Sequence, residues 1–134
     1  MKKRMIGVAA AGAVAATSAV VVAAPAWADG PERHAHGKVG GARYDIDIEK
    51  EHGTFEISVD LDDAPANSSW KLVVRHEGKK VGVRHASARY DDGEYEVDFR
   101  DVHSANTPGK DTFKVKIVRT DDTAKVTRTL QFAR

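Results

Sequence analysis

The chain has 134 residues, of which 21 are Lys or Arg and 20 are Asp or Glu, and it contains no cysteine. The lack of cysteine excludes disulfide cross-links, thiol nucleophiles and Cys-based zinc sites. The near balance of acidic and basic residues gives no net electrostatic attraction to nucleic acid, so a nucleic-acid partner is not expected.

Residues 1–28 are predicted to be a signal peptide. A positively charged start precedes a long apolar run, and Ala26-Trp27-Ala28 has the small-x-small pattern of a signal-peptidase site. The alternative, a transmembrane anchor, is disfavoured because the run is rich in weakly hydrophobic Ala and Gly. We therefore expect cleavage before Asp29, secretion to the cell exterior or envelope, and no membrane span afterwards. Three of the 21 basic residues and none of the 20 acidic ones leave with residues 1–28, so 18 basic and 20 acidic residues remain, a net charge of −2.

Residues 29–42 are expected to form a flexible N-terminal tail, because they are rich in glycine and show no periodicity. Within them, His34 and His36 form a His-x-His pair, which can contribute two imidazoles to Zn(II) or Cu(II) if a third ligand joins. The alternative is an ordinary solvated tail. A single folded domain is predicted over residues 43–134.

Alternation of apolar and polar residues predicts seven strands in that domain. They cover residues 43–49, 54–61, 70–75, 80–90, 94–100, 112–119 and 125–132. The 80–90 segment is too long for one flat strand, and its small residues at 86–88 predict a bend that carries its second half to the other sheet. Residues 101–111 show no period and are expected to form a crossover loop.

Seven short strands with one long crossover before the sixth predict an all-β, two-sheet Greek-key sandwich. The pattern resembles immunoglobulin-like and fibronectin-type-III-like domains, with Trp70 on the third strand and DTFKVKI, residues 111–117, in the place of the sixth. The chain is also similar to short exported single-domain proteins of actinomycetes, a group with no common activity. It departs from the immunoglobulin pattern in two ways: no cysteine pair joins the sheets, and Phe113 lacks the hydroxyl of a tyrosine corner. Trp70 shares a face with Leu72 and Val74 and is expected in the core, not as a sugar-stacking platform.

The sequence carries no G-x-S-x-G elbow, no H-E-x-x-H pair and no glycine-rich phosphate loop. We therefore expect a non-enzymatic extracellular binding module whose partner is a protein or an anionic surface polymer. The second hypothesis is a secreted metal-binding or inhibitor-like protein that acts through its Asp-rich loops. The third is an enzyme whose Ser, His and acid assemble only in space.

The strand assignment predicts two outer faces of opposite charge. The first, second and fifth strands share one sheet, whose outward residues are Asp45, Asp47, Glu49, Glu56, Ser58, Asp60, Glu94, Glu96 and Asp98. The third, sixth and seventh strands share the other, whose candidate binding face contains Lys71, Val73, Arg75, Lys114, Lys116 and Val118. We expect the two valines to lie close together and exposed among the cations, as a contact surface for an anionic partner. Arg128 falls on the apolar side of the last strand and is expected near an edge or at a bulge, where its guanidinium can reach solvent; the alternative is a buried partner.

Three connections should emerge at one pole of the sandwich, and each carries adjacent aspartates. The pairs are Asp62-Asp63, Asp91-Asp92 and Asp121-Asp122. Oxygen-rich loops of this kind are what Ca(II) requires, so the six carboxylates form a candidate calcium site. The alternative is that Asp serves here as an ordinary turn residue, since no spacing matches an EF-hand.

Overall fold

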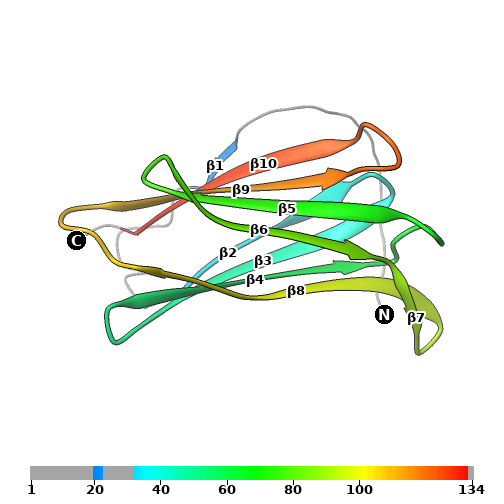
Figure 1. Cartoon of the computed structure of the whole chain (residues 1–134), viewed down its shortest axis with the longest axis horizontal. Coiled ribbons are helices and arrows are strands. Elements are labelled where there is room, and N and C mark those ends of the chain that lie inside the picture. Colours follow the sequence, from blue (N-terminus) through cyan, green and yellow to red (C-terminus); the bar gives the residue numbers. More distant parts are fainter. Residues whose placement is uncertain (1–19, 23–31, 133–134) are drawn as a thin grey trace.

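The computed structural model describes residues 20–22 and 32–132, and the regular structure there is β throughout. Two sheets pack face to face (Figure 1). The first runs in the order β1 (Val20–Val22), β10 (Lys125–Phe132), β9 (Asp111–Arg119), β5 (Ser69–His76) and β6 (Lys79–Ser87). The second runs in the order β2 (Glu32–Val39), β3 (Ala42–Glu51), β4 (Thr54–Asp62), β8 (Glu94–Ala105) and β7 (Arg89–Asp91). Neighbouring strands are antiparallel, except that β1 runs parallel to β10.

The predicted division of the strands between two sheets is confirmed. The expected count of seven is too low, because the described residues form ten strands; the seven expected ones correspond to β3, β4, β5, β6 with β7, β8, β9 and β10. The first, second and fifth of them share one sheet, and the third, sixth and seventh share the other. The expected bend is also found: β6 ends at Ser87 beside β5, and the chain resumes at Arg89 as β7 beside β8. The predicted signal peptide lies outside the described residues, apart from residues 20–22. No helix in the described part of the chain is long and apolar enough to cross a membrane.

The expected flexible tail is wrong for Glu32–Val39, which form β2 and pair with β3 along their whole length. The sequence conceals this strand because its inward positions carry Arg33, Ala35 and Gly37, which show no apolar period. Gly37 is required there, because a Cβ at this position would lie 2.6 Å from the hydroxyl of Tyr44. The tertiary packing against β3 therefore determines this strand, and local sequence preference does not.

The expected crossover loop is also too long, since β8 continues to Ala105 and only residues 106–110 connect it to β9. A bulge explains the difference. Ile57 pairs with Val102 and Val59 with Phe99, so two residues of β8 lie opposite Ser58, and Asp101 takes a φ of 65°. The extra residue shifts the alternation, which places both Phe99 and Val102 in the core and turns Ser104 inward.

The core lies between the sheets and is centred on aromatic side chains. Trp70 is 1% exposed, and its Nε1 donates a hydrogen bond to Ser68 Oγ at 2.8 Å, which confirms its predicted place in the core. The rings of Phe55 and Phe113 meet edge to face at 4.9 Å, one from each sheet. These contacts hold the two sheets together without a disulfide.

Arg128 extends from β10 toward the second sheet, where its Nη1 donates to the Tyr44 hydroxyl at 2.5 Å and to the His36 carbonyl at 3.1 Å. It therefore has a buried partner, the alternative to a solvent-facing position at a bulge. Arg33 makes the reciprocal contact, because its Nε donates to the Gln131 carbonyl at 2.9 Å. The two arginines thus join β2 and β10 along one side of the sandwich.

The three aspartate pairs share one end of the sandwich, as predicted. Antiparallel register places the end of β4 beside the start of β8, since Leu61 pairs with Val97. It likewise places the end of β9 beside the start of β5, since Arg119 pairs with Trp70. We call this end the acidic pole, and the other end, where residues 106–110 connect β8 to β9, the opposite pole.

Candidate functional site

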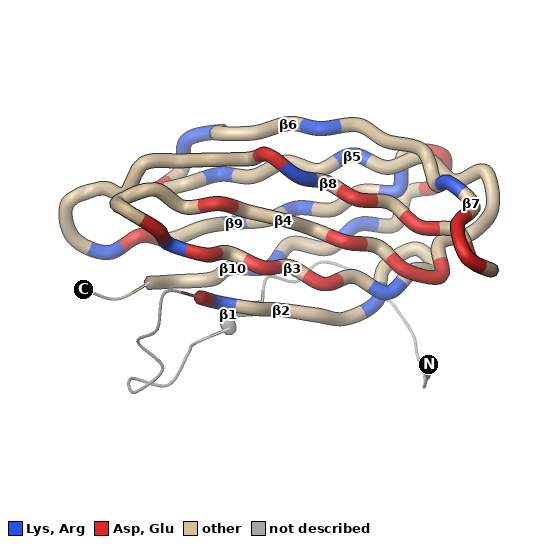
Figure 2. The backbone as a smooth tube through the Cα atoms, turned by 90° about the horizontal axis from the view of Figure 1, so that it is seen from below, with Lys and Arg blue, Asp and Glu red and all other residues tan. Residues whose placement is uncertain are grey.

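The acidic face is the outer surface of the sheet that contains β3, β4 and β8. Its carboxylates lie directly opposite one another on neighbouring strands: Asp45 pairs with Asp60, and Asp60 pairs with Asp98 on its other side. A second row joins Glu32, Glu49 and Glu56. Figure 2 shows acidic residues along β3, β4 and β8, and basic residues along β5, β6 and β9 in the other layer. Like charges placed directly across strands destabilise a sheet. The carboxylates of this face therefore repel one another unless a positive charge lies between them.

Arg100 supplies part of that counter-charge. Its Nη2 lies 3.3 Å from Asp60 Oδ1 and 3.8 Å from Asp98 Oδ1. Even so, burial and the adjacent Asp98 raise the pKa of Asp60 to about 6. Proximity to Glu32 likewise raises the pKa of Glu49. The acidic face therefore takes up protons, or other cations, more readily than separate carboxylates do.

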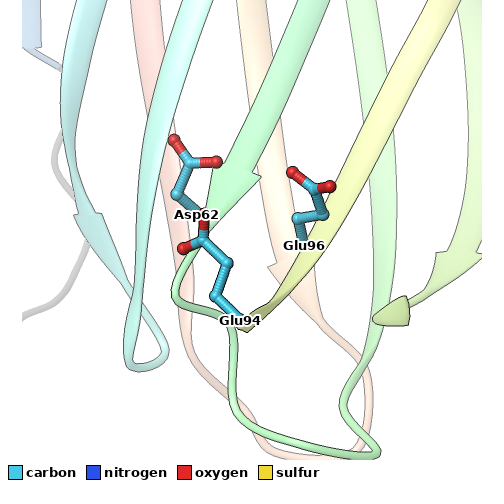
Figure 3. Close-up of side chains that lie close together, drawn as sticks. All are labelled: Asp62, Glu94 and Glu96. Carbon is cyan, nitrogen blue, oxygen red and sulfur yellow. The ribbon is translucent and has the colours of Figure 1, made fainter. Parts of the chain in front are cut away.

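Three carboxylates meet at the acidic pole, where β4 ends and β8 begins (Figure 3). Oxygens of Asp62, Glu94 and Glu96 all lie within 4.8 Å of one another. Contact with Asp63 raises the pKa of Glu94, and contact with Asp91 raises the pKa of Glu96 to about 7. Ca(II) binds carboxylate oxygens at about 2.3–2.6 Å, so oxygens at this spacing can share one ion. We call these three residues the carboxylate cluster.

The cluster contains only one of the six aspartates that sequence reasoning assigned to a metal. Asp63 and Asp91 contact its glutamates, whereas the turn residue Asp92 has a positive φ of 54°. The third pair has another role. Asp121 contacts Arg119 at 2.9 Å and accepts a hydrogen bond from the Ser69 amide at 2.9 Å, and Asp122 lies 3.9 Å from the same arginine. Arg119 and the Ser69 amide lower the pKa of Asp121 to about 2, so this carboxylate holds the β9–β10 turn against β5.

His34 and His36 lie on the acidic face, because β2 is part of that sheet. His34 Nε2 is 3.1 Å from Glu32 Oε1, and its Nδ1 contacts Asp47 Oδ1. The hydrogen bond with Asp47 raises the pKa of His34. When protonated, His34 is a counter-charge between two carboxylates, and a role for the His-x-His pair in Zn(II) or Cu(II) binding stays a prediction.

The basic face is the outer surface of the sheet that contains β5 and β9. Arg75 pairs with Lys114 on β9 and with Lys80 on β6, which gives a row of cations across three strands. The other outward cations are Lys71, Lys116 and Lys125, at positions set by the same register. In the described residues, no Asp or Glu occupies an outward position of β5, β9 or β10. The positive charges on this face therefore repel one another, as the carboxylates of the acidic face do.

The two valines of the candidate binding face are near neighbours, as predicted. Lys71 pairs with Val118, and Val73 pairs with Lys116. The two valines are therefore diagonal neighbours on the same face of adjacent strands. Both valines were predicted to be exposed. This prediction is wrong for Val73, which is only 7% exposed, and Val118 is half-buried. Val73 lies on an interior strand of its sheet, with Val83 of β6 opposite it on one side and Lys116 of β9 on the other. The face therefore offers charge to a partner and little apolar surface.

A buried polar network at the opposite pole was not predicted from the sequence. His76 Nδ1 lies 2.7 Å from Ser104 Oγ, and His76 Nε2 lies 2.7 Å from Asp111 Oδ1. Asp111 also accepts hydrogen bonds from the amide and the hydroxyl of Thr107, both at 2.9 Å. Burial raises the pKa of Asp111, but the hydrogen bonds from Thr107 and His76 outweigh it and keep the pKa below its ordinary range. The ionised carboxylate thus accepts a hydrogen bond from Nε2–H of His76, and the Ser104 hydroxyl can donate one to Nδ1.

These three residue types are those of a serine hydrolase, but their arrangement differs. In a hydrolase the serine contacts Nε2 and the carboxylate contacts Nδ1, which is the reverse of the contacts of His76. The imidazole is also stacked on Phe113 at 4.1 Å, and its side chain is 2% exposed. The network connects the end of β5, the end of β8 and the 106–110 connection. Its physical effect is to fix that connection against the core.

Comparisons with protein-family models, with curated proteins and with solved structures found no match to this chain.

Proposed function

We propose that this chain is an exported, non-enzymatic binding module with an immunoglobulin-like fold, which binds an anionic protein or surface polymer through its basic face. The observation that carries the proposal is the separation of charge between the two outer faces of the sandwich (Figure 2). Cations concentrated on one face attract an anionic partner although the whole chain is nearly neutral.

The strand order supports the immunoglobulin-like part of the proposal. The order β3-β4-β8-β7 matches the A-B-E-D sheet of such domains. The order β10-β9-β5-β6 matches the G-F-C sheet with an added C′ strand. Trp70 on β5 then occupies the place of the buried tryptophan of strand C. In this fold, binding through an exposed sheet face or through the loops at one end is common, and the basic face is the sheet face of the β5 and β9 layer.

The test uses inorganic polyphosphate as the polyanion and calorimetric titration as the readout. Replacing Lys71, Lys114 and Lys116 together by Gln should weaken binding by about 10-fold, since each exposed ion pair contributes up to about 1 kcal/mol. The matched control replaces Lys38, Lys50 and Lys110 by Gln, which removes the same charge from other parts of the surface. Equal losses of affinity in the two variants would show that only net charge matters and would refute a binding face.

A second candidate function, cation binding at the acidic pole, is favoured by one specific observation. The oxygens of the carboxylate cluster lie within 4.8 Å of one another, and proximity raises the pKa values of both of its glutamates. If Ca(II) binds there, millimolar CaCl2 should raise the melting temperature, and Asp62→Asn should abolish the rise. Asp45→Asn, on the same face but outside the cluster, is the control. An equal rise in all three proteins would indicate general screening of the acidic face.

A further inference from the structure

We propose that the acidic face of one copy of this protein docks on the basic face of a second copy, so that copies associate through opposite sides of the sandwich. The inference rests on the proposed function, because it uses the same basic face and names a partner for it. Figure 2 shows the separation of charge on which it depends.

Both faces carry an electrostatic cost that the isolated protein relieves only in part, since Arg100 contacts Asp60 and Asp98 but not Asp45. On the acidic face, Asp45, Asp60 and Asp98 form one row across three strands. On the basic face, Lys80, Arg75 and Lys114 form a row across three strands. Each row places like charges directly opposite one another, which destabilises a sheet. A surface of the opposite sign relieves both costs in one contact.

The two faces also match in spacing. Each row runs across the strands of a sheet, so its members are separated by the interstrand distance of about 4.8 Å. A row of carboxylates laid on a row of cations can therefore form several ion pairs at once. Charge complementarity of this kind sets the orientation of a complex and speeds its formation.

The geometry determines the kind of assembly. The contact joins two different surfaces, so each added copy leaves one acidic and one basic face available for further copies. The association should grow with protein concentration and should not stop at a symmetric dimer. Because exposed ion pairs are weak and screened by salt, it should be observed at low ionic strength and lost at high ionic strength.

The experiment is sedimentation velocity of the purified protein over a range of concentrations. NaCl at about 20 mM and about 500 mM changes the Debye length from roughly 20 Å to roughly 4 Å. At low salt the mean mass should rise with concentration to about twice the monomer mass or more, and at high salt it should remain that of the monomer. A monomer at low salt over the whole concentration range would overturn the proposal.

Two variants test which surfaces meet. The acidic-face variant replaces the row Asp45, Asp60 and Asp98 by Asn, and the basic-face variant replaces the row Lys80, Arg75 and Lys114 by Gln. Each variant retains one charged face, so each alone should stay monomeric, and an equimolar mixture should form a dimer that grows no further. Circular dichroism and the melting temperature verify that both variants fold. Absence of a mixed dimer would overturn the proposal, even if the wild type associates.

The same samples separate this inference from the proposed function. A wild-type protein that stays monomeric but binds polyphosphate through its basic face refutes self-association and supports the proposed function. A protein that associates as described, but whose polyphosphate affinity is the same in the basic-face variant, refutes binding of a polyanion and supports self-association.

Discussion

Removing the imidazole of His76 should destabilise the protein far more than the loss of one hydrogen bond suggests. In His76→Leu, Asp111 stays buried at 1% exposure and loses the hydrogen bond that it accepts from Nε2–H of His76 at 2.7 Å. A buried charge that has lost its partner costs about 3–5 kcal/mol. Loss of the stacking contact with Phe113 adds up to about 1.5 kcal/mol, which the leucine side chain partly replaces. We therefore expect the free energy of unfolding to fall by about 3–5 kcal/mol.

The assay is urea unfolding followed by the fluorescence of Trp70, which lies in the core. The double variant His76→Leu/Asp111→Asn removes the orphaned charge and should recover part of the loss, giving a coupling energy of about 1–3 kcal/mol. His85→Leu, at an exposed position on β6, is the control and should change stability by less than about 0.5 kcal/mol. Strictly additive losses in the double variant would refute the view that Asp111 depends on His76.

Two further predictions concern pH and packing. Folding raises the pKa of Asp60 to about 6 and that of Glu96 to about 7, so the folded state binds more protons than the unfolded chain and stability should fall from pH ~4 to ~7 at low salt. Asp121, with a pKa lowered to about 2, acts oppositely, so stability should also fall below pH ~4; a melting temperature that rises from pH ~5 to ~7 would contradict this account. Gly82→Ala should lower the unfolding free energy by about 1–3 kcal/mol, because the new Cβ would lie 2.7 Å from Val102 Cγ1. Adding Val102→Ala should reduce that steric cost, and an unfolding curve of Gly82→Ala identical to wild type would show that the core yields at this point.

Much of the sandwich could be predicted because its strands alternate strictly. In β4, Phe55, Ile57 and Val59 point inward and are fully buried, and the polar residues between them point outward. Period-two alternation fixes the face of every side chain once one is placed. The same alternation determines which charged residues share an outer face. The position of the three aspartate pairs at one end of the sandwich follows from counting strand directions.

The elements that were missed depend on contacts between distant segments. β2 pairs with β3 although its inward residues include Arg33 and Gly37, because Arg33 finds an acceptor in the Gln131 carbonyl and Gly37 makes room for Tyr44. The bulge at Asp101 interrupts the alternation of β8, so Ser104 could not be assigned to the inner side.

The candidate sites show the same limit. The carboxylate cluster takes Asp62 from one strand and Glu94 and Glu96 from another, whereas sequence reasoning assigned those glutamates only to the acidic face. Asp121 was assigned to the same site, but its lowered pKa arises from Arg119, which only the folded turn brings into contact. Local sequence patterns predict which charges lie on a face. Which side chains contact one another depends on the tertiary structure and cannot be obtained from those patterns.

The most direct test of the proposed function is a map of amide chemical shifts during titration with inorganic polyphosphate. If the basic face binds the polyanion, the largest changes should fall on outward residues of β5 and β9, centred on Lys71, Lys114 and Lys116, and the amides of β3 and β4 should not move. Changes spread evenly over the surface, or centred on the loops of the acidic pole, would contradict a binding function for the basic face.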